Sequence, residues 1–167
     1  MTWHISPIMK QTIAEKILAR ASGKKQVSPG DIVWAKPDLV QTMELQYPFF
    51  LKNLKDLKID KIYDPAKVAI FIDHVIPVDS IEGAERNKKI KEFARTHNIT
   101  KLYEGCGISH QVVAEKGLAR PGMLIVSDDT RSRTQGAFGA YGTCLELEVL
   151  MPLITGEIWM KVPESIN

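Results

Sequence analysis

The feature that most constrains the fold is a pair of short apolar runs, each of which is followed closely by acidic residues. Residues 68–72 (VAIFI) precede Asp73, and residues 123–126 (MLIV) lead, through one serine, to Asp128 and Asp129. Apolar runs without alternation are typical of central parallel strands, which are buried on both faces. Because ligands of open α/β sheets bind outside the carboxyl ends of the strands, acids at these positions are candidates for a functional site.

Helical spacing and turn residues divide the rest of the chain into alternating elements. Thr12 can cap a helix that extends to about Ser22. The other predicted elements are helices at 49–57 and 80–97, strands at 32–35 and 101–103, and a break at 36–38. Strands that alternate with helices indicate βαβ crossovers, since parallel strands need long connections. We therefore predict a three-layer α/β/α domain with a mainly parallel sheet.

Length and composition favour one domain and exclude several classes of protein. The chain has 167 residues with 44% hydrophobic content, which suits a single domain over residues 1–167. A net charge of +2 with interspersed signs gives no basic stripe, so we expect no nucleic acid partner. We also expect no membrane span and no signal peptide, because no apolar run approaches the roughly 20 residues that cross a bilayer.

The two cysteines of the chain, Cys106 and Cys144, lie far apart and have no neighbouring metal-ligand motif. They predict neither a disulfide framework nor a zinc site. A reducing, cytoplasmic location fits this use of cysteine best.

Five segments of the chain occur in an order and spacing that is more specific than any one of them. They read IAEKILARASGKKQVSPGDIV, VAIFIDHVIP, GISHQVVAEKGLARPGMLIVSDD, TQGAFGAYGT and TGEIWMKVPESI. Together they resemble the amino-terminal domain of the aconitase superfamily, nearest to the large subunit of 3-isopropylmalate dehydratase and to the homoaconitases. The resemblance implies a hydro-lyase that removes and re-adds water on a hydroxylated di- or tricarboxylic acid, with a [4Fe–4S] cluster, as in leucine biosynthesis.

The resemblance also implies catalytic roles for two pairs of residues. Asp73 and His74 match one pair of the family, and His110 matches a second that it forms through space with Asp129. Dehydration of a β-hydroxy acid needs a base for a carbon-bound proton, an acid for the departing hydroxyl and cations for the carboxylates. A carboxylate beside an imidazole fixes its tautomer and raises its pKa, so that the ring can deliver a proton near neutral pH.

Further positions of the resemblance imply contacts with substrate. Arg131 stands where the family has a histidine; arginine cannot shuttle a proton, but it can clamp a carboxylate in a bidentate fork. Glu44 keeps an acid that the family has, whereas Met43 replaces its hydrogen-bonding neighbour. The expected substrate-binding residues are Arg131, Arg133, Thr130, Ser132, Glu44 and Gln111.

The cluster ligands that the resemblance implies are not in this chain. In the family, three cysteines later in the large subunit hold the cluster, and Cys106 with Cys144 cannot supply three thiolates. We therefore expect as partners a cluster-bearing domain or chain and a small-subunit, swivelling-domain protein, besides a small carboxylic acid substrate. The chain is then a piece of a longer subunit, a stand-alone domain that completes a site with other chains, or a domain that has left the original chemistry.

Each candidate residue also has a purely structural interpretation. Asp73 can cap a helix, and His74 and His110 can fill polar niches of the core. Asp129 can form an Asx turn, and Asp128 is the better candidate for that role. Arginines in such a loop are commonly exposed cations.

The glycines at 136, 139 and 142 form GxxGxxG, which lacks the order of a dinucleotide fingerprint and indicates tight packing or a turn. Three functions stay open: a hydro-lyase component, a carboxylate-binding module without turnover, and a structural subunit that pairs with another chain.

Overall fold

The computed structural model describes residues 11–165, and its main sheet has five parallel strands in the order β4-β3-β2-β5-β6. The strands are β2 (Leu39–Met43), β3 (Val68–Ile72), β4 (Lys101–Glu104), β5 (Leu124–Ser127) and β6 (Tyr141–Cys144). The two apolar runs of the sequence are β3 and β5, which lie on either side of β2. The prediction of a mainly parallel sheet is confirmed.

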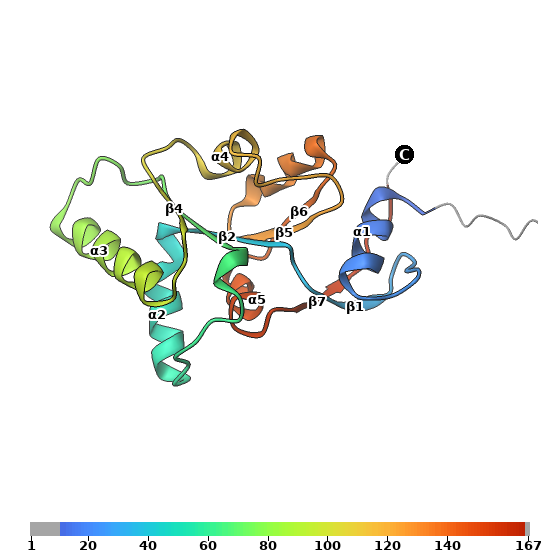
Figure 1. Ribbon diagram of the computed structural model, residues 1–167, viewed down its shortest axis with the longest axis horizontal. Coiled ribbons are helices and arrows are strands. Elements are labelled where there is room, and N and C mark those ends of the chain that lie inside the picture. The colour runs from blue at the N-terminus through green and yellow to red at the C-terminus, as the bar shows by residue number, and fades with distance from the viewer. Residues whose placement is uncertain (1–10, 166–167) are drawn as a thin grey trace, which may run out of the picture.

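Helices cover both faces of this sheet and complete three layers. They are α1 (Ile13–Ala21), α2 (Tyr47–Asp56), α3 (Ile81–Thr96), α4 (Ser109–Glu115) and α5 (Leu150–Thr155), with 3₁₀ segments η1 (Glu44–Gln46), η2 (Pro65–Lys67), η3 (Thr130–Phe138) and η4 (Glu146–Val149). Figure 1 shows α4 on one side of the sheet, and α2 and α5 on the other. The predicted α/β/α architecture is therefore confirmed.

The core explains why the central strands are apolar throughout. In β3, Val68, Ile70 and Ile72 belong to the larger core, which they share with α2 and α3. The alternate residues Ala69 and Phe71 belong to a smaller core beneath α4. Successive side chains of a strand point to opposite faces, and here both faces are covered. Burial of each large aliphatic side chain contributes about 1.5–3 kcal/mol to stability.

The helix starts follow the capping residues of the sequence. Thr12 caps α1: its hydroxyl accepts the N–H of Glu15, and the Glu15 carboxylate accepts the N–H of Thr12 at 2.6 Å. Ser80 caps α3 through the N–H of Gly83 at 3.1 Å. Such reciprocal and single caps satisfy donors that the first turn of a helix leaves free. The predicted helices at 12–22 and 80–97 are confirmed to within a residue or two.

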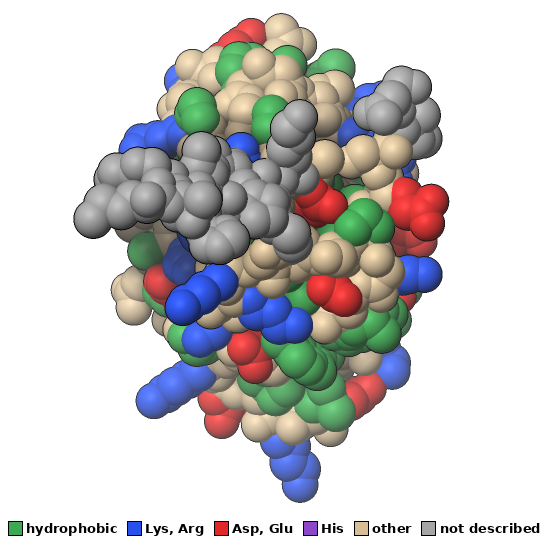
Figure 2. Space-filling view, turned by 90° about the vertical axis from the view of Figure 1, so that its right-hand side faces the viewer, with side chains coloured by type: hydrophobic (Ala, Val, Ile, Leu, Met, Phe, Trp, Pro, Cys, Tyr) green, Lys and Arg blue, Asp and Glu red, His purple; other side chains and the backbone are tan. Residues whose placement is uncertain are grey.

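The predicted strand at 32–35 is present, but it does not join the parallel sheet. The strand at 32–35, β1 (Ile32–Ala35), lies outside the main sheet and pairs antiparallel with β7 (Ile158–Lys161). Its outer face carries Trp34 opposite Trp159, and both indoles are exposed. Figure 2 shows the end of the molecule that carries α1 and this ribbon, where acidic and basic side chains are interspersed around apolar ones. On this face the basic residues form no continuous stripe.

Within residues 11–165, the structure contains no helix with the length and apolar character needed to cross a membrane.

Candidate functional site

The carboxyl ends of three adjacent strands bring the acidic candidates to one edge of the sheet. Glu44 follows β2, Asp73 follows β3, and Asp129 comes two residues after β5. The helix α4 begins beside them, with His110 in its first turn. The site that the sequence predicted at this edge is therefore assembled from loops and helix starts that the parallel sheet aligns.

His110 and Asp129 form the first pair. The ring Nδ1 of His110 lies 2.9 Å from Oδ2 of Asp129, whose side chain is 6% exposed. The same oxygen accepts the Ser109 hydroxyl at 3.1 Å, and the other oxygen accepts the N–H of Arg131 at 2.8 Å. These bonds fix the carboxylate. Because Nδ1 donates to Asp129, the second ring nitrogen, Nε2, is left to exchange a proton with a ligand.

Asp73 and His74 form the second pair, next to Glu44. Nδ1 of His74 lies 2.8 Å from Oδ1 of Asp73 and 3.6 Å from Oε2 of Glu44. Partial burial lowers the pKa of His74, but the hydrogen bond to Asp73 and the charges of both carboxylates outweigh it, so that the pKa is raised above its ordinary value. The imidazolium is therefore favoured at neutral pH relative to a free histidine.

Glu44 has a different environment from the one expected of a substrate-binding residue. Its side chain is fully buried, and its carboxylate accepts the N–H groups of Asp73 (3.3 Å), His74 (2.6 Å) and Val75 (2.9 Å). Three backbone donors occupy its oxygens, so the carboxylate holds the turn after β3 and presents no free oxygen to solvent. Direct substrate contact does not fit this burial.

Ser109 connects the two pairs, which the sequence analysis did not anticipate. Its N–H donates to Oδ2 of Asp73 at 2.6 Å, and its hydroxyl donates to Oδ2 of Asp129 at 3.1 Å. The residue is completely buried. Its place directly before His110, at the first position of α4, was the only signal available in the sequence.

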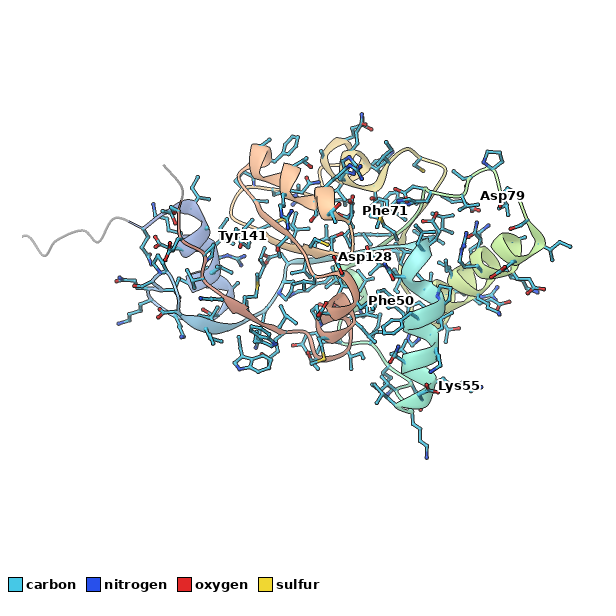
Figure 3. The ribbon with its side chains drawn as sticks, turned by 180° about the vertical axis from the view of Figure 1, so that it is seen from behind. Phe50, Lys55, Phe71, Asp79, Asp128 and Tyr141 are labelled. Atoms are coloured by element: carbon cyan, nitrogen blue, oxygen red, sulfur yellow. The ribbon has the colours of Figure 1, made fainter. Side chains whose placement is uncertain are left out.

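Asp128 is not the Asx-turn residue that it was expected to be. Its two carboxylate oxygens each lie 3.0 Å from the N–H of Met43, 85 residues away in the sequence. It is Asp129 that accepts the N–H two residues on, at Arg131. Figure 3 shows Asp128 in the interior, between the labelled Phe71 and Phe50.

The electrostatic surroundings of Asp128 are unfavourable for its charged form. The pKa of Asp128 is raised to about 7, mainly by burial and in addition by the charges of Asp129 and Asp73, while the N–H of Met43 acts in the opposite direction. The apolar surroundings and the neighbouring negative charges both disfavour the ionised form of Asp128. The neutral form of Asp128 is therefore favoured far more than that of an ordinary aspartate.

The loop after β5 presents the cationic candidates. Arg131, Arg133 and Thr130 are exposed, and neither guanidinium lies within 4 Å of a carboxylate of the described residues. Ser132 is fully buried and its hydroxyl has no protein partner, which does not fit the expected contact with substrate. Gln111 is exposed on α4, where its side chain donates to Glu115. Of the expected substrate-binding residues, the two arginines are the exposed cationic groups.

Two glycines and Gln135 hold η3 against the site, as the packing interpretation of GxxGxxG predicted. A side chain at Gly142 would place its first carbon 2.1 Å from the carbonyl oxygen of Ser132, and Gly139 ends η3 with φ 71°. The buried Gln135 donates to the carbonyl oxygen of His110 at 2.7 Å. No sequence signal pointed to this last contact.

The residues present do not fit an iron–sulfur cluster. Cys106 follows β4 and Cys144 ends β6, the two opposite edges of the sheet, which puts them on the order of 20 Å apart at the usual strand spacing. Burial also raises the pKa of the Cys144 thiol, which disfavours a thiolate ligand.

Glu44, Asp73 and His74 offer ligand atoms within 4.8 Å of one another. However, Glu44 and Asp73 already accept backbone N–H bonds.

Two imidazole–carboxylate pairs thus lie at the carboxyl edge of a parallel α/β sheet. A model of the aconitase family (aconitate hydratase) matches residues 15–167, and the chain belongs to this family. Among its relatives is the 3-isopropylmalate dehydratase large subunit of Aquifex aeolicus, 40% identical over 161 residues, which are 95% of this chain and 37% of the relative. Large subunit 1 of Pyrococcus furiosus is 40% identical over 159 residues, or 93% and 38%. The chain thus spans less than two fifths of the length of these relatives.

Proposed function

We propose that this chain is a component of a hydro-lyase of the 3-isopropylmalate dehydratase type, acting on a hydroxylated di- or tricarboxylic acid. The observation that carries the proposal is the contact of His110 with Asp129, 2.9 Å apart and joined through Ser109 to the Asp73–His74 pair. Two imidazoles, each held by a carboxylate, supply the proton transfers that dehydration requires.

In this proposal the chain holds the substrate and delivers a proton. His110 donates a proton from Nε2 to the departing hydroxyl while Asp129 stabilises the imidazolium through Nδ1. His74, whose pKa is raised, assists as a second cationic hydrogen-bond donor. Arg131 or Arg133 binds a substrate carboxylate in a bidentate fork.

Further chains or domains complete the enzyme in this proposal. The cluster-bearing part and the small swivelling-domain subunit are partners, because these residues do not fit a [4Fe–4S] cluster. Residues 1–167 act as one domain within that assembly. A cytoplasmic location is part of the proposal, and two unpaired cysteines support it.

The test is reconstitution of this chain with the cluster-bearing and small-subunit partners. Formation of the unsaturated acid is followed by ultraviolet absorbance with 2- and 3-isopropylmalate, homocitrate and citrate. His110→Gln and Asp129→Asn should each lower kcat by on the order of 10²–10⁴, as loss of a general acid does. Lys116→Ala, at the exposed end of α4, is the matched control and should retain activity. Wild-type protein that turns over none of these acids would refute the proposal.

A second function, carboxylate binding without turnover, is favoured by Arg131 alone, because a guanidinium cannot return a proton at neutral pH. Calorimetry distinguishes the two. Citrate-like acids would then bind to the wild type, and less tightly to Arg131→Ala, with no product formed in the assembled protein.

A further inference from the structure

The buried carboxylate of Asp128 contacts neither histidine of the two pairs. It is 5% exposed and makes no ion pair within residues 11–165. The one donor to it from another segment is the N–H of Met43, which lies 3.0 Å from each of its oxygens. A buried carboxylate with so few hydrogen-bond partners is energetically costly and therefore uncommon in folded proteins.

The hydrogen bond of Asp128 to Met43 is connected, through Glu44, to the turn after β3 that carries His74. Met43 is the last residue of β2, and the residue after it is Glu44. The Glu44 carboxylate in turn accepts the three successive N–H groups of residues 73–75. Because β2 lies between β5 and β3, a link from the end of β5 to the end of β3 passes through these two residues.

We infer that Asp128 is a positioning residue for the Asp73–His74 pair. By holding the N–H of Met43, it fixes the end of β2 and therefore the place of the Glu44 carboxylate. Oε2 of Glu44 lies 3.6 Å from Nδ1 of His74, and Oε1 accepts the backbone N–H of His74. The catalytic consequence rests on the proposed function, whereas the positioning itself does not.

The raised pKa of Asp128 is compatible with this role. A protonated carboxyl keeps a carbonyl oxygen, which still accepts the N–H of Met43. The contact therefore persists on both sides of the pKa of about 7. Asparagine offers the same carbonyl oxygen without the charge, and alanine offers neither, so the two substitutions separate the hydrogen bond from the charge.

The test measures the pKa of His74 by NMR of its ring in the whole chain, as a function of pH. In Asp128→Ala the carboxylate of Glu44 loses its anchor, and we expect the pKa of His74 to fall towards its ordinary value. In Asp128→Asn the pKa should stay close to the wild-type value. Asp38→Ala is the matched control: it removes a carboxylate that accepts the N–H of Leu124 at 2.7 Å, at the opposite end of β5, and should leave His74 unchanged.

Two outcomes would overturn the inference. If neither variant changes the pKa of His74, Asp128 does not position it. If alanine and asparagine lower it equally, the effect is that of charge and not of the hydrogen bond. Asp128→Ser, whose hydroxyl is too short to span the gap, replaces Asp128→Ala if that variant does not fold.

A kinetic arm connects the positioning to catalysis. In the reconstituted enzyme, Asp128→Ala should lower kcat about tenfold with little change in KM, and Asp128→Asn should restore most of the loss. If the NMR results hold while the wild-type enzyme turns over no hydroxy acid, the proposed function fails and the positioning stands. Equal kinetics in all three proteins would refute the catalytic consequence.

Discussion

Replacing Asp128 by asparagine should stabilise the protein at neutral pH. The pKa of this carboxyl is raised from 3.8 to about 7 by burial, with further contributions from Asp129 and Asp73. The folded state therefore holds a proton that the unfolded state has already released. The stability associated with the neutral carboxyl is fully present below pH 3.8 and is lost as the pH rises through about 7.

The size of the effect follows from the shift. A difference of about 3 pKa units corresponds to about 4 kcal/mol at 1.4 kcal/mol per unit. An asparagine of the same shape has no charge to bury and keeps an acceptor for the N–H of Met43. Its advantage over the wild type should grow from near zero at about pH 3 to roughly 4 kcal/mol at pH 8, with more than half of that gain between about pH 5 and pH 8.

Urea denaturation followed by circular dichroism, at several values between pH 5 and pH 8, measures this difference. The comparison of variant with wild type at each pH cancels the contributions of titrating groups that do not interact with Asp128. A difference in the free energy of unfolding that is constant over this range would refute the reasoning, since it would mean that Asp128 titrates alike in the folded and unfolded states.

Two further predictions concern packing and histidine charge. Gly142→Ala places a carbon 2.1 Å from the carbonyl oxygen of Ser132, and should cost about 2–3 kcal/mol and lower Tm by roughly 5–10 °C. Gly136→Ala, in the same loop with open space around it, should lower Tm by far less, and an equal loss would contradict the steric argument. The raised pKa of His74 should make it stabilise the fold at low pH and lose this effect as the pH rises through the folded-state value. His74→Gln should therefore lose more stability at pH 6 than at pH 9, by thermal denaturation, and the reverse order would contradict the sign.

The sequence was sufficient to predict those strands that are apolar on both faces. β3 and β5 are uniformly apolar because helices cover both sides of them. β2 is equally buried, but it contains the polar residues Gln41 and Thr42. Its hydropathy pattern therefore does not indicate a buried strand. β6 begins with Tyr141 and Gly142 and has no apolar run at all. Neither strand was predicted, although both belong to the main sheet.

The pairing of His110 with Asp129 was predictable from the strand-end rule and the resemblance, whereas the roles of the two adjacent acids were not. Successive residues at the end of β5 continue the alternation of the strand. Ile125 faces the smaller core beneath α4 and Val126 faces the larger one. On the same alternation Asp129 reaches His110 on α4, while Asp128 turns to the opposite side and meets β2. The arrangement of β3, β2 and β5 therefore decides that Asp129 pairs with His110 and that Asp128 contacts Met43.

The way in which the acids are held determines the charge that the site presents. Glu44, Asp73, Asp128 and Asp129 would repel an anionic substrate if they were exposed, but their side chains are at most 6% exposed and accept backbone N–H bonds. Beside these buried acids, the two imidazoles and the guanidinium groups of the following loop are more open to solvent. Buried carboxylates thus orient both histidines and favour the protonation of His74, while Arg131 and Arg133 add exposed positive charge on the loop after β5.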